Sequence, residues 1–333
     1  MATIKDVSEK SGISVKTISR VLNGVETVRP NVRAKVEAAI RELNYRPALA
    51  ARQLVSGKTY IIVILVPDVA AWYYSRMLLA MAQACRAVGW HLVVEVFDRQ
   101  ALEVDADWAI SLSCNADAVI VLPPWSDHPK MLRSLERLGL PTVRIAAQAR
   151  GFGKVVDVHQ RAAMAELVAH LIAQGHERIA MIAPPAAHFA SEQRHLGYRD
   201  AMAAAGLEAP PAYLFRSAMT FESGQEAFGH LMALPQRPTA IVAVNDATAL
   251  GAMTAALRLG FRVPQDLAFT GFDNSSESRS AFPPLTTVEP PFEQIARAAV
   301  LMAIDREEAS GDPVRPPDSP RIILRESTEG APV

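Results

Sequence analysis

From residue 60 onward, the chain alternates short apolar runs with longer segments of helical periodicity. The runs YIIVILV (60–66), DAVIVL (117–122) and AIVAV (240–244) have the length of strands and are apolar almost throughout. Strands of this kind are typical of parallel sheets that are covered by helices on both faces. The pattern therefore predicts an α/β body built on parallel sheets.

The alternating segments fall into two consecutive sets, which predicts two doubly wound parallel-sheet subdomains. We expect strands at 60–66, 90–97, 117–122, 142–146, 178–183, 240–244 and 267–271. We expect helices at 74–88, 101–113, 129–138, 159–174, 192–205 and 246–258. Three later segments complete the body: TTVEP (286–290), a helix at 292–306 and RIILRES (321–327).

The N-terminal part carries the signals of three short helices. Thr3 and Asp6 stand at the spacing of a capping box, and Gly12 ends the first helix. Ser14 is a good N-cap for a second helix, which runs from Val15 to about Asn23. A third helix follows with proline in its first turn. Three short helices with a tight glycine turn between the first two predict a helix-turn-helix unit.

Charge is distributed unevenly between this N-terminal part and the body. Residues 1–60 hold 11 Lys and Arg against 5 Asp and Glu, whereas the remaining residues hold 23 and 30, and the whole chain has a net charge of −1. A small basic head on a larger acidic body is typical of a polyanion-binding module joined to a domain with another role. A solvated charged face is the alternative that charge alone leaves open.

The second helix is the candidate DNA-reading element. In a helix-turn-helix unit this helix lies in the major groove, with its N-terminal residues against base edges. Arg20 can donate two hydrogen bonds to guanine, and Lys16 can donate to guanine or to a phosphate. Ser14, Thr17 and Asn23 are suited to phosphate contacts. A small helical bundle with exposed basic residues is the competing interpretation.

The stretch NYRPALAARQLVSGKT follows, and it contains a helix of about two turns that begins at Pro47. A helix this short is marginal alone in water, which suggests a hinge that orders only against DNA and a second copy of the chain. Leu54 is apolar where a linker should be polar, as a wedge between base steps in the minor groove would require. Packing of Leu54 on the body is the alternative.

These segments resemble a known family. ATIKDVSEKSGISVKTISRVLN, followed by ELNYRPALAARQL, is similar to the lactose repressor (LacI/GalR) family of bacterial transcription regulators. The resemblance implies that Val15, Lys16 and Arg20 read bases and that Leu54 kinks the centre of the operator. Thr3 and Ala51 complete the expected DNA-contacting residues.

The family resemblance also implies a domain organisation. Residues 1–46 are expected to form the DNA-binding head and residues 47–59 the hinge helix and linker. Residues 60–333 are expected to form a periplasmic-binding-protein-like body for effector binding and dimerisation. Its N-subdomain would comprise about 60–158 and 287–325, and its C-subdomain about 159–286.

Polar and aromatic residues follow the predicted strands of the body. In open parallel sheets, ligands bind beyond the carboxyl ends of the strands. Acids, amides, an arginine and aromatic rings in one cleft suit a polyhydroxylated ligand. Individually, Asp68 and Asp246 are also plausible helix caps, and Tyr73 a core residue. The candidate ligand residues from the strand ends are Asp68, Tyr73, Tyr74, Trp125, Arg194, Asn245 and Asp273.

The family resemblance singles out two of these candidate ligand residues. Asp273 in GFDN and Arg194 in RHLGY match the ligand-binding Asp and Arg of the family, which hold sugar hydroxyls or ribose. The chain departs from many relatives at Ala146 and Ala147, where an Asp or Trp often touches the ligand. We expect a sugar, while a nucleoside, a purine or a sugar acid stays open. Four further residues fall at family ligand positions: Tyr73, Tyr74, Asn245 and Met219.

The sequence favours a regulator over an enzyme. It contains no GxGxxG, GxxxxGK[ST] or GxSxG motif and no His residues at metal-ligand spacing, so we expect no catalysis, cofactor or metal. The charged N-terminus and the absence of a long apolar run favour a cytoplasmic protein without a membrane role. We expect a homodimer on a palindromic operator, with the ligand as inducer or corepressor. A stand-alone sugar-binding protein is the distant alternative.

Overall fold

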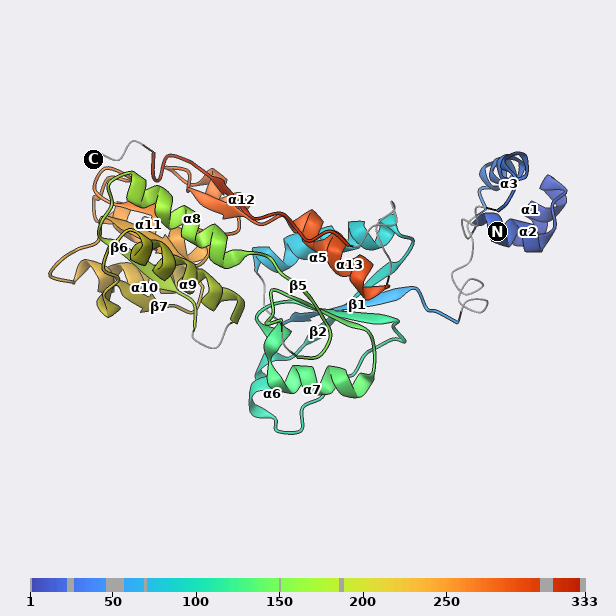
Figure 1. The fold of residues 1–333 in the computed structure, drawn as a ribbon, viewed down its shortest axis with the longest axis horizontal. Helices are drawn as coiled ribbons and strands as arrows, with labels where there is room; N and C mark the ends of the chain where they lie inside the picture. Colours follow the sequence, from blue (N-terminus) through green and yellow to red (C-terminus); the bar gives the residue numbers. More distant parts are fainter. Residues whose placement is uncertain are drawn as a thin grey trace. The chain divides into compact units, whose positions relative to one another are not determined.

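The computed structural model describes a small N-terminal head and a larger body. They form two compact units, Met1–Thr59 and Tyr60–Val333 (Figure 1). Each unit has hydrophobic core clusters of its own. The described residues are 2–22, 27–45, 57–68, 71–149, 151–185, 189–305 and 314–329.

The head consists of three helices, α1 (Ile4–Ser11), α2 (Val15–Leu22) and α3 (Pro30–Glu42). The capping box that begins α1 is present in both directions, because Thr3 accepts from the Asp6 amide and the Asp6 side chain accepts from the Thr3 amide. A glycine in the left-handed conformation ends this helix. The three helices and the capping signals expected from the sequence are confirmed.

One buried side chain from each helix meets in the core of the head. Val7 of α1, Ile18 of α2 and Val36 of α3 are completely buried. Val21 and Val28 join the same cluster. Because the apolar residues of α2 face inward at i and i+3, its polar residues are left on the outer face.

The first half of the body is a five-stranded parallel sheet of order β2-β1-β3-β4-β5. Helices α5 (Trp72–Ala87) and α13 (Phe292–Ala303) cover one face, and α6 (Arg99–Val104) and α7 (Pro129–Leu138) cover the other (Figure 1). A short 3-10 helix, η1 (Trp125–Asp127), follows β3. The strands are β1 (Ile61–Pro67), β2 (His91–Phe97), β3 (Ala118–Val121), β4 (Thr142–Ile145) and β5 (Lys154–Val156).

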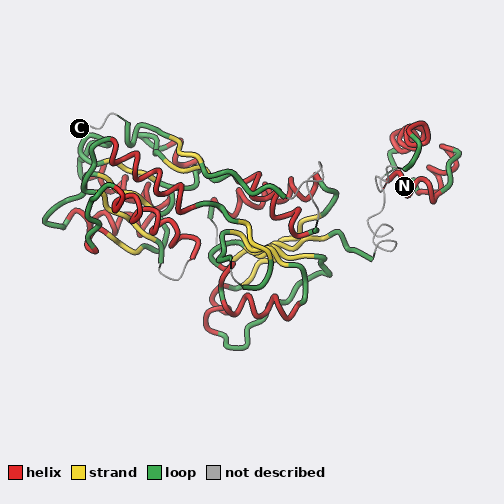
Figure 2. The backbone as a smooth tube through the Cα atoms, viewed as in Figure 1, coloured by secondary structure: helices red, strands yellow, loops and turns green. Residues whose placement is uncertain are grey.

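The second half is a four-stranded parallel sheet of order β7-β6-β8-β9 that lies among helices (Figure 2). Each face of the sheet carries a hydrophobic core. Its strands are β6 (Ile179–Ala183), β7 (Leu214–Arg216), β8 (Ala240–Ala243) and β9 (Ala268–Thr270). Helices α8 (Gln160–Ala173) and α9 (Phe189–Ala204) pack on one face. Helices α10 (Phe221–Met232) and α11 (Asp246–Arg258) pack on the other. Two short helices are η2 (Pro211–Tyr213) and α12 (Ser276–Ser280).

The helix expected at 101–113 is wrong in its extent, because α6 ends at Val104. The Lys130 ammonium donates to the carbonyl oxygens of Leu102, Glu103 and Asp105 at 3.0, 3.0 and 2.7 Å. These donations satisfy carbonyls at the end of α6 and place a cation at the negative end of the helix. A lysine that is distant in the chain therefore caps the end of α6. The local periodicity of the sequence cannot reveal such a contact.

The last segments of the chain serve both halves of the body. Helix α13 packs against α5 and the first sheet, as expected. The strands β10 (Thr287–Glu289) and β11 (Arg321–Ile323) instead form an antiparallel pair. Val288 and Ile322 of this pair pack into the core beneath α8, in the second half. The strands thus differ from the expected return of all three segments to the first subdomain.

Within the described ranges, no helix combines the length and the apolar character needed to cross a bilayer. The same ranges contain no group of three or more His, Cys, Asp or Glu side chains arranged to hold a metal ion. The two cysteines, Cys85 and Cys114, are free thiols.

Candidate functional site

Arg194 and Asp273 meet at the carboxyl edge of the second sheet. Arg194 lies on α9, and Asp273 follows β9 with a positive φ of 111°. The Arg194 Nη2 atom is 3.7 Å from Asp273 Oδ1, and Arg194 is 6% exposed. This distance is too long for a hydrogen bond, and the buried Oδ1 atom has no hydrogen-bond partner among the described residues. The edge therefore offers an unsatisfied acceptor beside a buried cation.

Three contacts fix the Arg194 guanidinium in place. Its Nε donates to Gln160 Oε1 at 2.7 Å, and its Nη1 donates to the carbonyl oxygen of Val244. The Phe272 ring lies 3.8 Å below the guanidinium carbon, as in a cation–π contact. Since Nε and Nη1 have acceptors, Nη2 is the nitrogen that faces Asp273.

Burial raises the pKa of Asp273 to about 7, because Arg194 offsets only part of the cost of burying the charge. A second buried acid, Asp246, raises the pKa of Asp273 further. Asp246 itself is fully engaged: it accepts from the Ser275 amide at 2.6 Å and from the Thr287 hydroxyl at 2.5 Å. Asp273 is thus the carboxyl that is left to exchange a proton or to accept from a ligand.

Tyr73 of α5 approaches this pair from the first half of the body. Burial raises the pKa of Tyr73, the charges of Tyr74 and Asp273 raise it further, and Arg194 lowers it. Its ring stands 5.6 Å from that of Tyr74 and 5.8 Å from that of Phe292. The Tyr74 hydroxyl donates to the Pro123 carbonyl at 3.2 Å. Of the two predicted tyrosines, Tyr73 is the one whose pKa responds to Asp273 and Arg194.

Asn245 and Met219 are also brought together, at the start of α11. Asn245 caps this helix by accepting from the Thr248 amide at 2.9 Å. Its side-chain amide donates to the Met219 carbonyl at 3.1 Å. Met219 has a positive φ of 65°. The polar groups of Asn245 are thus used to hold the loop that carries Met219.

Asp68 and Trp125 both make contacts within the first half of the body. Asp68 is exposed and accepts from the Arg99 amide at 3.1 Å, which supports its interpretation as a cap. Trp125 is 6% exposed, and its ring packs at 5.5 Å against Phe97. The aromatic face of Trp125 therefore belongs to the core that also includes Met131.

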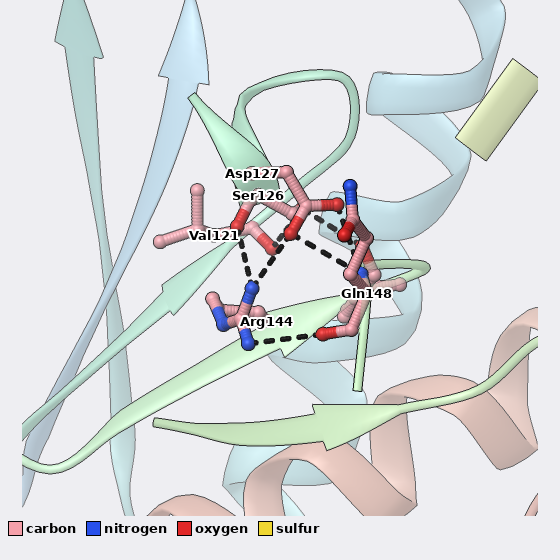
Figure 3. A network of polar contacts seen from close by, with 6 residues as sticks. Val121, Ser126, Asp127, Arg144 and Gln148 are labelled. Atoms are coloured by element: carbon pink, nitrogen blue, oxygen red, sulfur yellow. Dashed lines mark hydrogen bonds and ion pairs between the residues drawn. The ribbon is translucent and has the colours of Figure 1, made fainter. Parts of the chain in front are cut away.

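A buried network supports the loop that carries Ala146 and Ala147 (Figure 3). The completely buried Arg144 donates to Asp127 Oδ1 at 2.7 Å and to the Gln148 carbonyl at 3.1 Å. The Gln148 amide in turn donates to Asp127 Oδ2 at 2.9 Å. Both alanines are buried, and Ala146 has a φ of 52°. The polar groups here hold the loop in shape, and Ala146 and Ala147 place methyl groups on it.

Arg144, Gln160 and Phe272 are among the residues of these networks that sequence reasoning missed. Arg144 carried a visible signal, because it is a charge within the apolar run TVRIA. Gln160 and Phe272 carried none: their partner, Arg194, lies 34 residues beyond Gln160 in the chain and is reached only through the fold.

The outer face of α2 carries the predicted DNA-reading residues. Val15 is 41% exposed, and Lys16 and Arg20 are also exposed. Ser14 begins the helix by accepting from the Thr17 amide at 3.3 Å. Thr3 is engaged in the capping box of α1. Three predicted DNA-contacting residues lie outside the described residues: Asn23, Ala51 and Leu54.

Comparisons with known protein families agree with this division into head and body. Residues 3–48 match the family described as bacterial regulatory proteins, lacI family. Residues 168–328 match the periplasmic binding protein-like domain.

Individual proteins are similar over nearly the whole chain. The HTH-type transcriptional repressor CytR of Escherichia coli strain K12 is 31% identical, and the match covers 99% of this chain and 97% of that protein. The ribose operon repressor of the same strain is 31% identical, over 92% and 93%. A solved structure of the transcriptional regulator CelR–cellobiose complex has a TM-score of 0.68 at 28% identity, over 98% and 100%.

Proposed function

The chain belongs to the lacI family of bacterial regulatory proteins, and from that premise we propose that it is a repressor controlled by a small polyhydroxylated ligand. In this proposal the head binds operator DNA and the body binds the effector. The body has a binding role and no catalytic one, since the family consists of regulatory DNA-binding proteins. A role on operator DNA places the protein in the cytoplasm.

The DNA half of the proposal rests on the exposed face of α2. The helix is anchored by Ile18 in the core, which leaves Lys16 and Arg20 outside to meet base edges in the major groove. One head covers half a site, so a two-fold homodimer would read a palindrome. Residues 47–59 would act as the hinge, with Leu54 as the wedge in the minor groove.

The ligand half rests on one observation, the buried Arg194–Asp273 pair at 3.7 Å with an unsatisfied carboxyl oxygen. Buried polar atoms in proteins are nearly always paired, so an orphan acceptor beside a fixed arginine favours a ligand with hydroxyl donors. A hydroxyl can donate to Asp273 and accept from Arg194 at the same time. Tyr73, Asn245 and Met219 would complete the site.

Sugars are the favoured ligand class, and the regulated genes would serve carbohydrate uptake or catabolism. One relative is named for the ribose operon, and another was solved with cellobiose. Nucleosides present the same paired hydroxyls on ribose, so they are the second class to test. The ligand would act by differential affinity for two arrangements of the body, which changes the spacing of the two hinges.

A ligand screen with the full chain tests the proposal. D-ribose, cellobiose and a set of nucleosides are compared by thermal shift and by isothermal titration. A ligand present at about 100 times its Kd should stabilise the protein by roughly 2.7 kcal/mol. Arg194→Ala should abolish this stabilisation, whereas Arg161→Ala, which removes a surface arginine paired with Asp200, should retain it. Unchanged affinity in Arg194→Ala would place the ligand elsewhere.

A further inference from the structure

The Arg20 side chain is held by a residue outside its own helix. Its Nη2 atom donates to the hydroxyl oxygen of Thr27 at 2.7 Å. Arg20 lies in the last turn of α2, and Thr27 lies seven residues later in the chain. The contact therefore joins the outer face of α2 to the segment that leads into α3.

Thr27 stands on a firmly anchored part of the head. The next residue, Val28, is buried in the core with an exposure of 8%. Arg29 then caps the start of α3, and its carbonyl oxygen accepts from the amides of Val32 and Arg33, both at 3.0 Å. Because Val28 and α3 fix the backbone on one side of Thr27, its hydroxyl presents a positioned acceptor to the guanidinium.

One hydrogen bond to Thr27 leaves the guanidinium able to read a base. Arginine has five N–H donors in a planar fork, and bidentate recognition of guanine uses two of them. A guanidinium that is already oriented loses less side-chain freedom when it docks on DNA than a free one does. Both side chains are exposed, so this orientation comes from the hydrogen bond and not from burial.

We propose that Thr27 is a positioning residue for Arg20. By holding the guanidinium, Thr27 increases the preference of Arg20 for one base pair in each half-site. Thr27 acts through Arg20 and reads no base itself. The inference rests on the proposed function, because it takes Arg20 as a base reader.

The test compares Thr27→Val, which keeps the shape and loses the hydroxyl, with Thr27→Ser, which keeps the hydroxyl. Full-length wild type, both variants, Arg20→Ala and the double variant Arg20→Ala/Thr27→Val each select from randomised DNA duplexes. The position at which Arg20→Ala loses its preference identifies the base pair that Arg20 reads.

Thr27→Val should weaken discrimination at that base pair by about threefold to tenfold, as expected for a side chain that has to be ordered on binding. Discrimination at the other base pairs and the salt dependence of DNA binding should stay unchanged. Thr27→Ser should resemble the wild type, and Thr27→Val should have no further effect once Arg20 is absent. Thermal unfolding of each variant establishes that the head is intact.

Two results would overturn the inference while leaving the proposed function standing. One is wild-type discrimination at every position in Thr27→Val. The other is a uniform loss of affinity on all sequences with a smaller salt slope, which is the signature of a phosphate contact. If the wild type itself selects no sequence, then the proposed DNA-binding function fails together with the inference.

Discussion

Asp273→Asn should make the unliganded protein more stable, although it removes a residue of the candidate ligand site. Burial raises the pKa of Asp273 from 3.8 to about 7. At a pH between these two pKa values, the Asp273 carboxyl has released its proton in the unfolded protein and keeps it in the folded protein. The folded state then binds more protons, so stability falls as the pH rises from about 4 to about 7. Asparagine resembles the protonated form and escapes this loss.

The size of the effect follows from the two pKa values. At ~1.36 kcal/mol for each pKa unit, burial of the Asp273 carboxyl costs roughly 1–2 kcal/mol at pH 5 and roughly 4 kcal/mol above pH 7. Asn also tolerates the positive φ of 111° at this position, so the backbone adds no opposing strain. The stability gain from the substitution should therefore grow between pH 5 and about pH 7 and level off above that pH.

Urea denaturation of wild type and Asp273→Asn at pH 5, 6, 7 and 8, without ligand, measures this difference. Asp266→Asn is the control, and this substitution should lower the stability of the folded protein instead of raising it. Hydrogen bonds from Arg262 lower the pKa of Asp266 to about 2, so its contribution is present above about pH 4 and is lost as the pH falls. An Asp273→Asn difference that stays constant from pH 5 to pH 8 would refute the account of a buried, unsatisfied carboxyl.

Three further substitutions test the supporting structure. Arg144→Met leaves Asp127 without its buried cation and should lower the free energy of unfolding by about 3–5 kcal/mol in urea; a loss below about 1 kcal/mol would contradict this. Gln160→Leu removes the acceptor of Arg194 Nε and should weaken binding of the screened ligand at least tenfold by titration, with unchanged affinity as the contrary result. Leu54→Ala should preserve ligand binding and lower specific operator affinity; an unchanged DNA bend would argue against the wedge.

The fold was predictable where local patterns and packing agree. The apolar strands and the capping box of α1 follow from residue type and spacing alone, whereas α11 is capped by Asn245 and not by Asp246. The strands β5 and β7 have three residues each, too few for a periodicity to show. The end of α6 depends on Lys130, which is distant in the chain, and the placement of β10 and β11 depends on a core assembled from several helices.

The charged residues of the candidate ligand site were predictable from the sequence. The residues that hold them in place were not. Arg194 and Asp273 each follow a strand of the same sheet, so their meeting follows from the rule for parallel strands. The orientation of Arg194 depends on Gln160 and Phe272, which have no motif of their own. Trp125 follows a strand, and its ring packs in a hydrophobic cluster with Phe97, a contact that the sequence pattern does not reveal.

The central claim is that operator binding and ligand binding are linked through Asp273. Fluorescence anisotropy of the selected operator, at one salt concentration, gives the operator Kd with and without the ligand found in the screen. In the wild type, the ligand should change this Kd by about 5- to 150-fold, in either direction. In Asp273→Ala, which removes the acceptor oxygens, the operator Kd should be the same with and without ligand. A wild-type Kd that does not respond to the ligand, or an equal response in Asp273→Ala, would contradict the link through Asp273.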